Sequence, residues 1–123
     1  MLQEIQIAQG KKTSPQDRWY TDRDFDLFVW GVAGDRIAGF QLCYDKQSEE
    51  RALTWLEAAG FSHDRIDSGE QHPTRNMTPV LLPDGLFPYA RIKTLLDSVM
   101  GNIESRLSTI IMERLREYAE RTH

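Results

Sequence analysis

The chain has 123 residues, of which 40% are hydrophobic and 28% are charged, and this is the size and composition of one globular domain. Nineteen acidic residues against fifteen basic ones give a net charge of −4, which excludes the strongly basic composition that most nucleic-acid binders share. No stretch approaches the roughly 18 apolar residues of a membrane-spanning helix, so we expect neither nucleic acid nor a membrane as a partner.

Alternating apolar residues predict β-strands in the first part of the chain. Ile5 and Ile7 indicate a short strand over residues 3–8. Two further strands are indicated by residues that alternate on either side of Gly34-Asp35, namely Phe25, Leu27 and Val29 before it and Phe40, Leu42 and Tyr44 after it. Gly34-Asp35 suits a two-residue hairpin turn, because glycine adopts positive φ without strain.

The turn at Gly34-Asp35 also predicts the register of this hairpin. If Ala33 opposes Arg36, the six apolar residues fall on one face as three facing pairs, which are Val29 with Phe40, Leu27 with Leu42, and Phe25 with Tyr44. A slip by one residue would move the apolar set of one strand to the opposite face. The turn and the hydrophobic pattern therefore predict the same pairing.

The segment after the hairpin has the pattern of a helix. Ser48 suits an N-cap before Glu49 and Glu50. Apolar residues then recur at helical spacing, at Ala52, Leu53, Leu56 and Ala59. Gly60 suits the C-terminal cap of such a helix. Residues 61–67 predict a fourth strand, which makes the helix a crossover connection within the sheet.

Residues 68–88 predict a long loop, because prolines and an Asp-Gly pair interrupt them repeatedly. Val80-Leu81-Leu82 within this loop is interpreted as a short strand or a buried anchor. The apolar residues of the loop also permit a small-ligand pocket between the loop and the sheet.

From Pro88 onward, apolar residues recur at three- and four-residue steps as far as Tyr118, which predicts a helical region over residues 89–121. One unbroken helix would be roughly 50 Å long, whereas a domain of this size is about 35 Å across. The helix must therefore break at Gly101-Asn102, or protrude and find a partner.

These elements predict a single α+β domain. Residues 1–67 would form an antiparallel β-meander with one crossover helix and a fourth strand, residues 68–88 a loop, and residues 89–121 a long or broken C-terminal helical region.

A protruding helix and an apolar patch on the hairpin both predict self-association, and a two-fold homodimer is the commonest assembly. The candidate interface residues are Phe28, Trp30, Val32 and Ile37 on the hairpin, together with Val99, Ile103, Leu107, Ile110, Ile111 and Leu115 on the helix. The leading hypothesis is accordingly a small non-enzymatic binding or assembly module that forms a homodimer through its C-terminal helix, with a further protein or small-ligand partner left open.

The rival hypothesis is a small metal-dependent hydrolase. Imidazole and carboxylate groups are ligands for zinc, manganese or iron, and four such residues gather at the start of the 68–88 loop, namely His63, Asp67, Glu70 and His72. Their spacing matches no established metal motif, so solvated loop residues are the simpler interpretation. We expect no cofactor, with a divalent metal at this cluster as the one alternative.

Two further groups of residues are weaker candidates. Asp22, Asp24 and Asp26 would line one strand face with Asp45 across the sheet, where either a cation or nearby basic residues would relieve the repulsion. Cys43 is the single cysteine, and a mid-strand thiol is expected to be inert. The lack of a disulfide pair and of a secretory signal at the N-terminus predicts a cytoplasmic protein.

Overall fold

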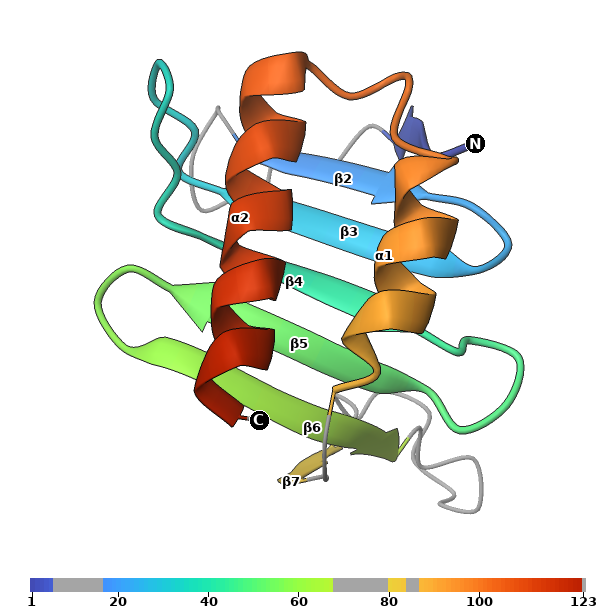
Figure 1. The fold of residues 1–123 in the computed structure, drawn as a ribbon. Coiled ribbons are helices and arrows are strands. Elements are labelled where there is room, and N and C mark those ends of the chain that lie inside the picture. Colours follow the sequence, from blue (N-terminus) through green and yellow to red (C-terminus); the bar gives the residue numbers. More distant parts are fainter. Residues whose placement is uncertain (6–16, 68–79, 84–86, 123) are drawn as a thin grey trace.

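The structure is a computed structural model that describes residues 1–5, 17–67, 80–83 and 87–122. It has an α+β architecture, in which a seven-stranded antiparallel sheet carries two helices on one side (Figure 1). The elements in chain order are β1 (Gln3–Ile5), β2 (Arg18–Thr21), β3 (Phe25–Trp30), β4 (Gly39–Tyr44), β5 (Arg51–Leu56), β6 (Gly60–Asp67), β7 (Val80–Pro83), α1 (Tyr89–Asp97) and α2 (Ser105–Thr122).

The hairpin of β3 and β4 has the predicted register. The facing pairs are Phe25 with Tyr44, Leu27 with Leu42, and Val29 with Phe40. Ala33 and Arg36 form a bridge across the turn, and Gly34 has a φ of 63°. The local pattern sufficed here because turn and strands specify the same pairing.

The predicted crossover helix is wrong, because residues 51–56 form strand β5. All seven strands lie in chain order, and each one is antiparallel to the next. Pairing with β4 places Leu53 opposite Leu42 and Trp55 opposite Phe40, and it buries both side chains. A helix with its apolar stripe at Leu53 and Leu56 would have left the large Trp55 side chain beside that stripe.

The residues that suggested helix caps belong to turns between strands. The backbone N–H of Ser48 donates to the carbonyl of Asp45 at 3.1 Å, which closes the turn between β4 and β5. Gly60 has a φ of 85° where the chain reverses between β5 and β6. Glycine and serine are favoured in turns for the same reasons that favour them at helix ends, so their positions alone did not distinguish the two structures.

The remaining strands agree with the prediction in part. Strand β1 covers residues 3–5 of the segment predicted as 3–8, and the rest of that segment lies outside the described residues. Strand β6 matches the predicted fourth strand, but a hairpin joins it to β5. Val80-Leu81-Leu82 pairs with β6 as part of β7, whereas β2 was not predicted.

The C-terminal helical region is broken, which is one of the two outcomes that the sequence predicted. Helix α1 ends at Asp97 and α2 begins at Ser105, so the turn between them includes Gly101 and Asn102. The N-terminal segment holds this turn in place, since the Leu2 N–H donates to the Val99 carbonyl at 3.0 Å and the Asn102 Nδ2 donates to the Leu2 carbonyl at 3.1 Å.

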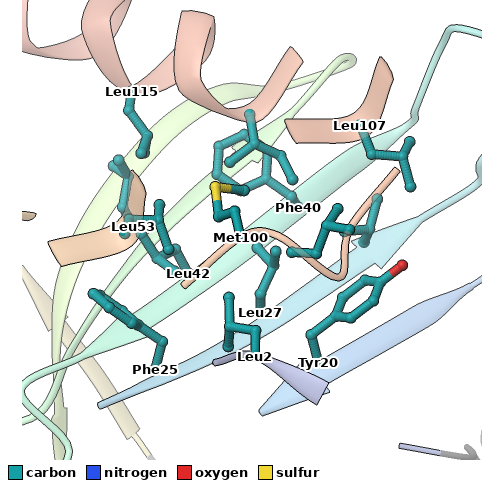
Figure 2. Close-up of a cluster of buried hydrophobic side chains, with 14 of the residues drawn as sticks. Leu2, Tyr20, Phe25, Leu27, Phe40, Leu42, Leu53, Met100, Leu107 and Leu115 are labelled. Carbon is teal, nitrogen blue, oxygen red and sulfur yellow. The ribbon is translucent and has the colours of Figure 1, made fainter. Parts of the chain in front are cut away.

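The hydrophobic core fills the space between the sheet and the helices. Leu107 and Leu115 point from α2 toward the sheet, where Phe40, Leu42 and Leu53 lie (Figure 2). All five side chains have exposed fractions of 0%. Burial of each such side chain contributes roughly 1.5–3 kcal/mol, and this term holds the helices on the sheet.

Two substitutions in β5 test the strand assignment. Leu53→Ala is expected to lower the free energy of unfolding by about 2–5 kcal/mol, because it opens a cavity at a fully buried site. Leu56→Ala is expected to cost clearly less, since the Leu56 side chain is 40% exposed. Urea denaturation at low protein concentration measures both. Equal losses would instead fit a helix that buries both leucines.

Candidate functional site

Strand pairing divides the side chains of the sheet between two faces. Phe25, Leu27 and Val29 of β3 belong to the core beneath the helices. Because successive side chains in a strand point to opposite sides, Phe28 and Trp30 lie on the face turned away from both helices, which we call the far face. The far face is the first candidate for a functional surface.

Five apolar side chains come together at one end of the far face. The register places Ile5 beside Trp19 and Trp19 beside Phe28, while Trp30 and Leu56 flank Gly39. These five residues form the aromatic patch, whose members are Ile5, Trp19, Phe28, Trp30 and Leu56. All of them retain exposed surface.

The packing within the aromatic patch is specific. The Trp19 and Phe28 rings stack with centroids 5.4 Å apart and planes inclined by 18°. A Cβ atom at Gly39 would lie 2.7 Å from the Leu56 Cδ2 and 2.6 Å from the Trp55 carbonyl oxygen. Residue 39 therefore has to be glycine. The Trp19 Nε1 is buried without a hydrogen-bond partner among the residues that the structure describes, which is costly for an indole N–H.

Charged side chains lie next to the patch on the far face. The Lys46 Nζ is 3.0 Å from the Asp26 Oδ1 and donates to the Asp22 carbonyl at 2.8 Å. Burial raises the pKa of the Glu50 carboxyl above its usual value, and the charge of Asp26 raises it further. We call Asp26, Lys46 and Glu50 the charged cluster, and with all three ionised its net charge is −1.

The predicted interface residues divide between the core and the far face. Phe28 and Trp30 lie in the aromatic patch, whereas Val32 and Ile37 are buried in the core at 4% exposure each. Gly31 has a φ of 61°, so the chain leaves the strand geometry after Trp30 and the alternation does not extend to Val32. The prediction that Val32 and Ile37 share one patch with Phe28 and Trp30 was therefore wrong.

The predicted interface on the C-terminal helix packs against the sheet of the same chain. Four of its side chains are buried, namely Ile103, Leu107, Ile111 and Leu115, and two are partly buried against the same core, namely Val99 and Ile110. The stripe that suggested a protruding helix is the stripe that holds α2 on the sheet.

His63 of the predicted metal cluster is a core residue. It is 5% exposed, and its Nε2 shares a hydrogen bond with the Tyr44 hydroxyl. The rings of Phe87 and Tyr118 lie 5.7 and 6.1 Å from its ring. Burial raises the pKa of the Tyr118 hydroxyl, and the charge of Asp64 adds to this effect. Aromatic rings packed around a buried side chain in this way stabilise the hydrophobic core.

The remaining ligands of the predicted metal cluster are not described. Glu70 and His72 lie outside the described residues, as does the side chain of Asp67. Within the described part of the chain, no three His, Cys, Asp or Glu residues are close enough to hold a metal ion. The metal-dependent hydrolase stays a prediction.

The acidic residues predicted to share one strand face have separate structural roles. The Asp22 Oδ1 accepts hydrogen bonds from the backbone N–H groups of Asp24 and Phe25 and so caps the β2–β3 turn. Both carboxylate oxygens of Asp45 accept from Arg91, at 2.8 and 2.9 Å, and these bonds lower the pKa of the Asp45 carboxyl. Lys46 neutralises Asp26. Basic residues thus neutralise Asp26 and Asp45.

Cys43 and His63 cannot act together, because they lie on opposite faces of the sheet. Cys43 pairs with Ala52 in the far-face row, whereas His63 pairs with Leu53 in the core row. Burial raises the pKa of the Cys43 thiol to about 12, and the carboxylates of Glu50 and Asp26 contribute to the rise. The thiol is therefore protonated at neutral pH.

Comparison of the chain with protein-family models, with curated proteins and with solved structures found no match. Among the described residues, no helix combines the length and the apolar character that a bilayer crossing requires.

Sequence reasoning missed Leu56 and Glu50, and it did not assign Trp19 to a strand. Trp19 is in β2, whose alternation is only four residues long. Leu56 and Glu50 were both assigned to the helix that the structure replaces with β5. The bulky Trp55 between Leu53 and Leu56 was one signal for a strand, and the β-branched Thr54 was another, since aromatic and β-branched residues favour strands.

The raised pKa of Cys43 predicts low thiol reactivity. In the folded protein at about pH 8, a disulfide reagent such as DTNB is expected to react at least about a hundredfold more slowly than in the urea-unfolded chain, because the thiolate is the nucleophile. Absorbance at the wavelength of the released thiolate gives both rates. Equal rates would show that the Cys43 thiol is not buried and that its pKa is not raised.

The raised pKa of Glu50 predicts that replacing its carboxyl group stabilises the protein, by an amount that depends on pH. The ionised carboxyl is disfavoured in the folded state, so this penalty is absent below the unfolded pKa and develops as pH rises through the folded pKa. Glu50→Gln should therefore raise the free energy of unfolding at neutral pH, and the gain should shrink toward about pH 4. Urea unfolding across this range measures it.

The matched control for Glu50→Gln is Glu113→Gln, which alters an exposed side chain on α2. A gain that is the same in both variants, or that does not change with pH, would contradict the assignment.

Proposed function

We propose that this protein is a non-enzymatic binding module that assembles as a homodimer, with the far face of its sheet as the contact surface. The observation that carries the proposal is the aromatic patch, in which stacked Trp19 and Phe28 adjoin Trp30 on the side of the sheet that α1 and α2 do not cover. Aromatic side chains that keep exposed surface are enriched at protein interfaces.

The extent of the far face supports a second copy of the chain as the partner. Strands β1 to β6 span about 24 Å at 4.8 Å spacing, and six residues of strand span about 20 Å. The face of each copy therefore covers about 500 Å², so that two copies would bury at most about 1,000 Å² in total if the whole face took part. This area is at the lower end for a specific interface, which indicates a dimer whose formation depends on protein concentration.

The charges on the far face favour one orientation of the two copies. With all three groups ionised, the charged cluster has a net charge of −1, because Lys46 balances only one of the two carboxylates of Asp26 and Glu50. Two such clusters facing each other would repel, whereas two aromatic patches facing each other would bury apolar surface. The two-fold axis of the proposed dimer therefore passes close to Trp30, away from the charged cluster.

This proposal keeps the homodimer hypothesis and moves its contact surface. The helical stripe is occupied within the chain, since Leu107 and Leu115 are completely buried in its core. Of the predicted interface residues, Phe28 and Trp30 are the ones that lie on the far face.

Substitution within the aromatic patch tests the proposed dimer. At high protein concentration, light scattering coupled to size-exclusion chromatography should give twice the 14.3 kDa of one chain. Trp30→Ser and Phe28→Ser should each weaken association by about tenfold or more, because each removes apolar area from the contact.

Leu95→Ser is the matched control, since Leu95 is a similarly apolar side chain, 43% exposed, on α1. It should leave the dimer unchanged. A wild-type mass of one chain at all concentrations, or equal effects of Leu95→Ser and Trp30→Ser, would overturn the proposal. Circular dichroism of each variant confirms that the fold is retained.

A further inference from the structure

One carboxylate of the charged cluster has no cation to balance it. The ammonium group of Lys46 has three N–H donors and three acceptors, which are the Thr21 Oγ1 at 3.3 Å, the Asp22 carbonyl at 2.8 Å and the Asp26 Oδ1 at 3.0 Å. Glu50 is not among them, and no basic group in the described ranges forms an ion pair with it. Glu50 therefore carries the surplus negative charge of the cluster.

Backbone pairing determines the side of the sheet on which Glu50 lies. Its carbonyl accepts from the Ile66 N–H at 2.8 Å, which continues the β5–β6 pairing by one residue. Glu50 precedes Ala52 by two positions, and Ala52 pairs with Cys43 in the far-face row, so the Glu50 side chain shares the far face. The residue is partly buried. A partner that covered the whole far face would cover this carboxyl as well.

The charged and titratable groups around Glu50 come from four segments. Asp26 lies on β3, Cys43 lies on β4, and Lys46 lies in the turn between β4 and β5. On β6 the titratable residue of the far face is Asp64, which continues the row of Cys43. Acidic groups thus outnumber the single cation in these surroundings.

These surroundings favour the uncharged form of Glu50. Burial raises the pKa of its carboxyl, the charge of Asp26 raises it further, and the charge of Lys46 partly offsets the rise. Glu50 therefore takes up a proton at a higher pH than an exposed glutamate does. With Glu50 protonated, Asp26 and Lys46 balance each other, and the net charge of the cluster changes from −1 to 0.

The charge state of Glu50 limits how much of the far face a second copy can cover. Removing water from an unpaired carboxylate is costly, whereas removing it from a neutral carboxyl costs much less. A second copy therefore has to leave the charged cluster in water while Glu50 is ionised, and it can extend over the cluster once Glu50 is neutral. The pair of Asp26 and Lys46 is already joined by a hydrogen bond.

We infer that dimer formation through the far face is coupled to the uptake of protons by Glu50. This inference rests on the proposed homodimer and adds a regulation to it. Ionised Glu50 confines the contact to the aromatic patch around Trp30, and protonated Glu50 lets the two faces overlap more fully. Each copy has one Glu50, so up to two protons are taken up for each dimer formed. The dimer therefore becomes tighter as the pH falls below neutral.

The expected change in affinity is about tenfold between about pH 7.5 and about pH 5.5. A tenfold change corresponds to about 1.4 kcal/mol, which the burial of roughly 55 Å² of additional apolar surface supplies at about 25 cal/mol per Å². This area is a small part of the roughly 500 Å² that one face covers. A modest extension of the contact is therefore sufficient.

Sedimentation equilibrium of the full chain at constant ionic strength tests the inference. The dissociation constant of the wild-type dimer should be about tenfold lower at about pH 5.5 than at about pH 7.5. Glu50→Gln replaces the carboxyl with a neutral amide of similar shape. Its dimer at about pH 7.5 should therefore be as tight as the wild-type dimer at about pH 5.5, with little further change on acidification.

Glu113→Gln separates this effect from the general loss of net charge as the pH approaches the isoelectric point of about 5.3. It removes one negative charge from an exposed residue of α2, which lies on the other side of the sheet from the far face (Figure 1). This variant should keep the wild-type dependence on pH. Circular dichroism at both pH values confirms that each variant is folded.

Two results would overturn the inference and leave the dimer in place, provided that Trp30→Ser still prevents association. They are equal wild-type dissociation constants at both pH values, and the same dependence on pH in Glu50→Gln as in the wild-type protein. A mass of one chain for both proteins at both pH values would overturn the proposed dimer itself, and the inference with it.

Discussion

The burial of one face of the sheet beneath α1 and α2 is the constraint on which the rest of the structure depends. The seven strands follow one another in chain order, and among the described residues no crossover helix covers the second face. Both helices come at the end of the chain and lie on the same side (Figure 1). Since side chains alternate along a strand, burying Leu27 and Leu42 in the core directs Phe28 and Cys43 to the far face. In each strand, the residues that lie in the core therefore determine which of their neighbours lie on the far face.

Lys46 joins the far face to the turns at one end of the sheet. Its ammonium group binds Asp26 on the far face and the carbonyl of Asp22 in the β2–β3 turn. The same lysine thus neutralises a carboxylate next to the aromatic patch and connects the β2–β3 turn to the β4–β5 turn. Asp45 has a matching role, since its φ of 56° shapes the β4–β5 turn while its carboxylate binds Arg91. These ion pairs position surfaces, and the apolar core supplies most of the stability.

Sequence reasoning recovered the parts of the fold whose signals are local. The β3–β4 hairpin was predicted residue by residue, because the turn at Gly34 and the apolar alternation beside it specify one register. Strand β5 was not predicted, because its leucines also fit a helical period. Pairing with β4 is what makes this segment a strand. For the same reason, only part of the aromatic patch was predicted from the sequence. Phe28 and Trp30 lie on a strand that was recognised, whereas Trp19 lies on β2, which was not.

What the sequence determined by itself is the α+β class and the β3–β4 hairpin. Chain length and domain size left two outcomes for the C-terminal helical region, a break or a protruding helix, and packing on the sheet of the same chain decided for the break. Only the tertiary structure determined which apolar stripes are buried within the chain itself. The stripe of α2 at Leu107 and Leu115 found its partner in the sheet of the same chain, while the aromatic patch lies on the face that the helices do not cover. A hydrophobic pattern specifies that a surface is to be buried, but it does not specify what buries it, because the hydrophobic effect has no direction.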